Sequence, residues 1–195
     1  MADLSLSSRS AFHGLLAPVG PTPAGVSVIE RAGLELAVVE TRRGRRAEML
    51  ARVEALHGLS PPPRLGRAAA GPTAFLGVGP NRWLAISEVP AFADDLARGL
   101  EGVASVIAQT DGLAVLRISG PRAPETFAKG LPIDLDPAVF AVGDVAGSIL
   151  AHITITIWRV GEASWEVAVP RSFAGDFWHW LAQSAAEFGL AVESP

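Results

Sequence analysis

Two stretches of the sequence share a pattern that decides the fold: residues 83–96, WLAISEVPAFADDL, and residues 165–177, WEVAVPRSFAGDF. Each begins with a Trp that opens a short apolar run and continues into a Phe-Ala pair and an Asp. Short apolar runs bounded by turn residues predict strands, and apolar residues four apart predict a helix. We therefore expect the same strand–helix unit twice, with the two Trp residues equivalent and the two Phe residues, Phe92 and Phe173, also equivalent.

Around these units the two halves of the chain predict one order of elements. In the first half we expect two strands in 26–39, a helix in 46–57, a loop from 61 to 72, a hairpin of 73–78 with 83–87, a helix in 90–100 and a strand in 103–109. In the second half we expect a strand in 113–118, a helix in 121–129, a loop from 132 to 143, a hairpin of 148–158 with 165–169, a helix in 173–188 and a strand in 190–192. This order predicts an α+β fold of duplicated split βαβ modules. The predicted boundaries are an extended N-terminal arm over 1–25, a first α+β repeat over 26–109 and a second over 110–195.

The composition excludes several classes of protein. Of the 195 residues 49% are hydrophobic and 18% are charged, which is too apolar for a disordered chain. The sequence has no Cys, so disulfide scaffolds, thiolate metal sites and a cysteine nucleophile are excluded. The net charge of −4 lacks the basic excess typical of a nucleic-acid partner.

The sequence also predicts a cytoplasmic protein without a membrane partner. No apolar run approaches the roughly 20 residues that a membrane helix needs. The first residues, MADLSLSSRSAFHGLL, have neither the basic start nor the long apolar segment of a signal peptide.

Motifs for catalysis and for cofactor binding are missing. The sequence contains no G-x-G-x-x-G after a strand, no phosphate-binding loop and no G-x-S-x-G nucleophile elbow. Its four His residues never occur three or four positions apart, so no helical metal pair is formed. We therefore expect no catalytic residue and no metal site in this chain, and no cofactor site can be assigned.

Two Trp residues are candidates for contact with a partner protein. In the strand predicted around 149–159, the Ile residues alternate onto one face and Trp158 lies on the other, beside two Thr. In the last predicted helix, Trp178 lies about 100° from the centre of the apolar stripe. Since interfaces are enriched in Trp, we expect at least one of these rings to be exposed and to mark a partner interface.

The second half also resembles a known family. The residues that carry the resemblance are the run Leu113–Ala123, the pair Lys129-Gly130, the segment Pro132–Leu135 with Phe140, and the segments Val169–Phe173 and Phe177–Leu181. In order and spacing they resemble the gamma subunit of heterotetrameric sarcosine oxidase. That family is similar in fold to the folate-binding domain of the glycine-cleavage T-protein, which agrees with a duplicated α+β chain.

The resemblance implies a non-catalytic structural subunit that assembles with alpha, beta and delta subunits. It implies a complex that oxidises sarcosine with oxygen to glycine and hydrogen peroxide and passes the methyl carbon to tetrahydrofolate. The FAD, FMN, NAD, tetrahydrofolate and zinc sites would belong to the other subunits, and this chain would bind none of them. Leu131 stands where the family often has Cys, which leaves room for a relative that serves another demethylating oxidase.

Two alternatives stay open at this point. The first is a standalone folate-binding protein of the T-protein fold, which a basic and acidic lining of a central cavity would favour. The second is an adaptor unrelated to one-carbon chemistry.

Overall fold

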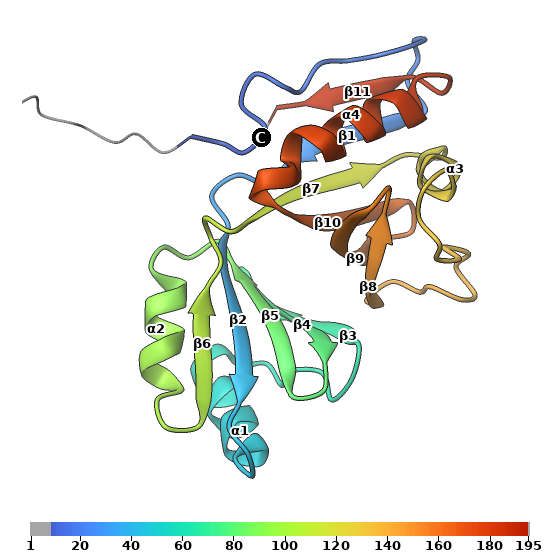
Figure 1. Ribbon diagram of the computed structural model, residues 1–195. Coiled ribbons are helices and arrows are strands. Elements are labelled where there is room, and N and C mark those ends of the chain that lie inside the picture. Colours follow the sequence, from blue (N-terminus) through green and yellow to red (C-terminus); the bar gives the residue numbers. More distant parts are fainter. Residues whose placement is uncertain (1–8, 195) are drawn as a thin grey trace, which may run out of the picture.

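The computed structural model describes residues 9–194, within which the chain forms two β-sheets with helices packed on them (Figure 1). The first sheet has the order β3-β4-β5-β2-β6. Its strands are β2 (Glu35–Thr41), β3 (Gly66–Ala70), β4 (Thr73–Gly79), β5 (Arg82–Ser87) and β6 (Ala104–Ala108), and its helices are α1 (Arg46–His57) and α2 (Phe92–Gly99). The predicted stop of α1 is confirmed, since Gly58 follows it in the left-handed conformation that favours glycine.

The second sheet has the order β8-β9-β10-β7-β1-β11. Its strands are β1 (Val26–Glu30), β7 (Leu113–Ser119), β8 (Val145–Leu150), β9 (Ile153–Gly161), β10 (Ser164–Pro170) and β11 (Leu190–Glu193). Its helices are α3 (Ala123–Ala128) and α4 (Ala174–Ala185), the latter preceded by the single turn η1 (Arg171–Phe173).

The strand order of the second sheet reproduces that of the first, with β1 added. Strands β8-β9-β10-β7 correspond to β3-β4-β5-β2, and β11 corresponds to β6. Trp83 is the second residue of β5 and pairs with Val39 of β2, while Trp165 is the second residue of β10 and pairs with Ile118 of β7. The predicted equivalence of the two Trp residues is therefore confirmed.

The predicted equivalence of Phe92 and Phe173 is wrong. Phe92 is the first residue of α2 and is buried, whereas Phe173 ends η1 and is 45% exposed. Both helices begin nine residues after their Trp, α2 at Phe92 and α4 at Ala174, so Phe173 lies one position too early and the buried Ala174 corresponds to Phe92.

Strand β1 was expected in the first repeat, but it belongs to the second sheet. It pairs in parallel with β11 and antiparallel with β7. Val26 and Val28 are fully buried in the core on the helix side of that sheet. The short segment between Glu30 and Glu35 therefore carries the chain from one sheet to the other.

Two strands were not predicted correctly. The segment expected as one strand around 148–158 is the hairpin of β8 and β9, because Ala151 and His152 form a turn with positive φ angles of 44° and 73°. Such angles favour Gly and Asn, so the turn had no sequence signal. As a consequence Ile149 is exposed instead of lying in the core. The loop expected from 61 to 72 contains β3, whose three Ala residues gave little indication of a strand.

Three groups of buried residues hold the layers together. On the helix side of the first sheet, Trp83 and Phe75 pack with Met49 of α1 and Leu96 of α2. On the helix side of the second sheet, strand residues pack with α3, α4 and Phe12 of the N-terminal arm. The third group lies between the two sheets and has these members: Leu34, Leu36, Leu76, Leu84, Ile86, Val115, Val145, Trp158 and Ala168. We call this third group the inter-sheet core.

Candidate binding cleft between the sheets

The two Trp residues expected at a partner surface are both buried. Trp158 does lie opposite the Ile face of β9, but that second face packs in the inter-sheet core and the residue is 0% exposed. Trp178 is 8% exposed and belongs to the core between α4 and the second sheet. The expectation that one of them is exposed is wrong, and for Trp158 the reason is that the sequence does not show that the first sheet covers the polar face of β9. Neither ring locates a partner interface.

Strand pairing brings three polar side chains into one row across the second sheet. Glu166 of β10 is paired directly with Arg117 of β7 on one side and with Trp158 of β9 on the other. Paired residues of adjacent strands point to the same face. Since Trp158 is part of the inter-sheet core, the whole row faces the first sheet.

Glu166 is the centre of this row. Its carboxylate oxygen Oε1 accepts hydrogen bonds from Nε and Nη2 of Arg117, at 3.1 and 2.8 Å, and from Nη1 of Arg31. Its Oε2 accepts a hydrogen bond from the indole Nε1 of Trp158 at 2.9 Å. The Glu166 side chain is only 7% exposed, so two guanidinium groups compensate a charge that burial alone would strongly disfavour.

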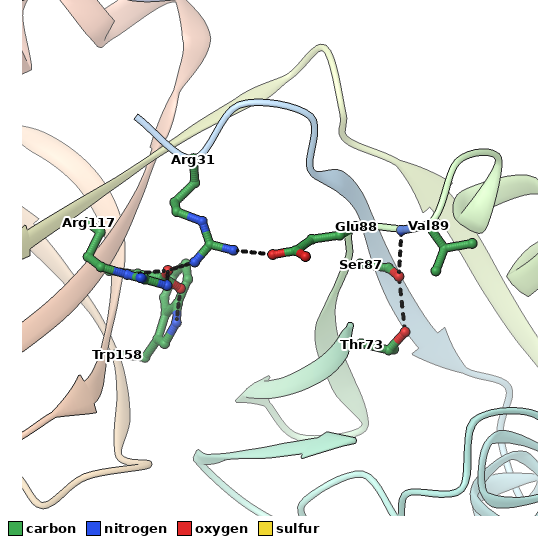
Figure 2. A network of polar contacts seen from close by, with 8 residues as sticks. Arg31, Thr73, Ser87, Glu88, Val89, Arg117 and Trp158 are labelled. Carbon is green, nitrogen blue, oxygen red and sulfur yellow. Dashed lines mark hydrogen bonds and ion pairs between the residues drawn. The ribbon is translucent and has the colours of Figure 1, made fainter. Parts of the chain in front are cut away.

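Arg31 joins the row to the other half of the molecule. It lies between β1 and β2, where the chain passes from one sheet to the other, and its Nη2 donates to Glu88 Oε1 at 2.7 Å. Figure 2 shows Arg31 reaching toward Glu88, which follows β5 of the first sheet. Beside it, Ser87 and Thr73 share a buried hydrogen bond of 3.0 Å. A continuous polar network therefore crosses from one sheet to the other.

A cleft of about 380 Å³ opens along this network. We call it the inter-sheet cleft. Its charged lining residues are Arg31, Arg67, Glu88, Arg117 and Glu166, and its apolar lining includes Leu34, Ile86, Trp158 and Val160. The volume lies at the lower end of the range for small-molecule sites.

The sequence did contain a signal for this site. Strands β7 and β10 are nearly continuous apolar runs, and Arg117 and Glu166 are the single charged residues in them. Opposite charges at such positions suggest a buried pair. Sequence reasoning missed them because their proximity depends on the register between two strands that are about fifty residues apart in the chain.

Among residues 9–194 no group of three or more His, Asp or Glu residues is placed to hold a metal ion. Within the same range, no helix is long and apolar enough to cross a membrane. The polar groups that line the inter-sheet cleft form the candidate site, and their chemistry is that of charge pairing and anion binding.

The fold has relatives among solved structures. The glycine cleavage system aminomethyltransferase T from Bartonella henselae matches with a TM-score of 0.63 and 17% identity, over 89% of this chain and 48% of that chain, which shows a shared α+β fold. A chain of the heterotetrameric sarcosine oxidase from Corynebacterium sp. U-96, solved in complex with pyrrole 2-carboxylate, matches with a TM-score of 0.81 and 30% identity. That match covers 93% of this chain and 96% of the solved chain.

Comparisons of the amino-acid sequence agree with this comparison of structures. Residues 43–187 match the family described as sarcosine oxidase, gamma subunit family. The sarcosine oxidase subunit gamma of Arthrobacter sp. is 38% identical over 136 residues, which span 67% of this chain and 66% of that relative. The chain therefore belongs to the sarcosine oxidase gamma subunit family.

Proposed function

We propose that this chain is a non-catalytic structural subunit of a heterotetrameric, flavin-dependent sarcosine oxidase. The observation that carries the proposal is the structural likeness to a chain of such an oxidase, which extends over 93% of this chain and 96% of the other. A likeness over nearly the full length of both chains supports a shared role better than a shared motif would.

The chemistry of the described residues supports a structural role. The most buried carboxylate in the cleft, Glu166, has both oxygens occupied by Arg31, Arg117 and Trp158. A general base or nucleophile needs a free, activated group next to the reacting atom, and no side chain of the cleft has that arrangement. The network is instead suited to fixing the two sheets relative to each other.

The proposal places the reaction on the partner subunits. Sarcosine, oxygen and tetrahydrofolate would give glycine, hydrogen peroxide and the methylene adduct of tetrahydrofolate. The FAD, FMN, NAD, tetrahydrofolate and zinc sites would lie on the alpha, beta and delta subunits, in a cytoplasmic complex.

A spectrum and an activity assay of the purified chain test the non-catalytic role. We expect no flavin absorbance and no peroxide from sarcosine when this chain is assayed alone. A yellow protein with bound flavin, or peroxide production by the isolated chain, would show that it has a catalytic site of its own.

One observation favours a second candidate, folate binding by this chain. The inter-sheet cleft has the basic and acidic lining that would favour this alternative. Equilibrium dialysis of the isolated chain against tetrahydrofolate would detect it. Saturable binding of one tetrahydrofolate would support this candidate, and its absence at millimolar ligand would exclude it.

A further inference from the structure

We propose that the inter-sheet cleft binds a small molecule that carries one carboxylate on a compact apolar body. This inference goes beyond the structural role, because it assigns a ligand to this chain and does not depend on assembly with other subunits. It rests on three features of the cleft: an excess of positive charge, guanidinium groups with free donors, and an apolar wall beside them.

The first feature is the balance of charge in the lining. Arg31, Arg67 and Arg117 supply three positive charges, and Glu88 and Glu166 supply two negative charges, which leaves one positive charge. In a partly enclosed site that charge is not fully screened by water. One added carboxylate would neutralise the cleft.

The second feature is the position of Arg67. This residue of β3 is paired with Leu76 of β4, which is buried in the inter-sheet core, so its side chain points to the face that lines the cleft. Within residues 9–194 its guanidinium forms no hydrogen bond and no ion pair with another side chain. Glu166 leaves the Nη1 of Arg117 unused as well, since it engages only Nε and Nη2. A planar guanidinium presents paired N–H groups that match the two oxygens of a carboxylate.

Arg31 has a different role in the same cleft. Its two terminal nitrogens are already engaged, one by Glu166 and the other by Glu88. It therefore neutralises the fixed carboxylates, while Arg67 and Arg117 provide the donors for a ligand.

The third feature is the apolar wall. Leu34 and Ile86 of the inter-sheet core line the cleft together with Val160. Small-molecule sites commonly combine an apolar lining with a few placed polar groups that fix orientation. A ligand with a flat or branched apolar body would contact this wall while its carboxylate meets the arginines.

A matched pair of probes tests the proposal on the full chain. Benzoate and benzamide have nearly the same shape, and only benzoate carries a negative charge. Isothermal titration calorimetry in a phosphate-free buffer at neutral pH should show saturable binding of benzoate and binding of benzamide weaker by about tenfold or more, the factor that a hydrogen bond to a charged group contributes. Inorganic phosphate serves as an anion that has no apolar body.

Two variants make the test specific. Arg67→Gln removes the free guanidinium and should weaken benzoate binding by about tenfold. Arg64→Gln changes an exposed Arg of the same segment that does not line the cleft, and it should leave binding unchanged. Both positions are exposed, so both variants should fold with the thermal stability of the parent chain.

Four results would overturn the proposal. They are an absence of saturable benzoate binding, equal affinity for benzoate and benzamide, tighter binding of phosphate than of benzoate, and an Arg67→Gln variant that binds benzoate as well as the parent does. The first would leave the arginines with a structural role only. None of the four bears on whether the chain assembles into the oxidase.

Discussion

At the two central strands of each sheet, the same row of positions is apolar in one half of the molecule and charged in the other. In the first sheet the row that passes through the residue after Trp83 contains Val38, Leu84, Leu76 and Arg67. In the second sheet the row that passes through the residue after Trp165 contains Arg117, Glu166, Trp158 and Val145. Both rows contribute side chains to the cleft or to the inter-sheet core.

The repeated fold requires an apolar helix-side face on each sheet, but it permits charged residues on a face between the sheets. The helix-side faces stay apolar in both halves, because each must bury a helix. The faces between the sheets share that burial, yet one of them accommodates Arg117 and Glu166 by pairing them with each other and with Arg31. The candidate site is therefore located where the two halves differ, and not where they agree.

Making the second row resemble the first should have the largest effect. Glu166→Leu copies Leu84 and removes the partner of Arg31, Arg117 and the Trp158 indole N–H. Loss of one member of a buried ion pair costs about 3–5 kcal/mol, and since Arg117 is 40% exposed we expect about 2–3 kcal/mol here. Urea unfolding measures the loss.

Two companion variants complete this test. Glu88→Gln changes the exposed partner of Arg31 and should cost less than about 1 kcal/mol. Arg117→Val, which copies Val38, should restore about 1 kcal/mol or more of the free energy of unfolding when added to Glu166→Leu, because it removes the Arg117 charge that has lost its partner. If Glu166→Leu alone unfolds at the same urea concentration as the parent chain, the charged row does not stabilise the fold.

The equivalent Trp residues provide a finer comparison. Trp83 Nε1 donates to the backbone oxygen of Pro62 at 2.8 Å, whereas Trp165 Nε1 is buried and has no hydrogen-bond partner among residues 9–194. Both rings have an Arg guanidinium 5.2 Å from the ring centre, so that contact is matched. Trp83→Phe should therefore cost about 1 kcal/mol more than Trp165→Phe. Equal losses in thermal unfolding would mean that the hydrogen bond to Pro62 contributes nothing.

The smallest expected effect is a pH dependence of stability that His57 gives to the helix-side core of the first sheet. His57 ends α1 against the rings of Phe75 and Phe92, at 6.2 and 5.4 Å between ring centres, and its burial lowers its pKa. The unfolded chain then binds this proton more readily than the folded chain does. The free energy of unfolding should fall as the pH drops below about 6.5, and the fall should be small because His57 is only partly buried.

Replacing His57 tests whether this residue causes the pH dependence of unfolding. His57→Leu should remove part of the stability change between about pH 7.5 and about pH 5.5, a range above the ordinary carboxylate pKa values. His179→Leu is the matched control, because His179 is an exposed residue of α4. Identical pH profiles for the parent and the His57 variant would contradict the prediction.

Local sequence patterns correctly predicted those features of the fold that depend on residues close together in the chain. The repeated Trp and helix signals identified equivalent strands, and the alternation of β9 placed Trp158 opposite its Ile residues. The wrong predictions share one cause, because each concerns a feature that is set by pairing between segments far apart in the chain. Strand β1 joins the second sheet, and Trp158 of that sheet is covered by the first sheet. The Glu166 network depends on the same long-range pairing, so the site was not predicted.

Reconstitution of the complex tests the proposed structural role most directly. The alpha, beta and delta subunits from the same host would be co-expressed with and without this chain, and the purified product would be analysed by light scattering and by peroxide release from sarcosine. We predict a four-subunit mass and full activity when the chain is present, and incomplete assembly with reduced activity when it is absent. A stable, fully active complex of the other three subunits, from which this chain elutes separately, would contradict a structural role.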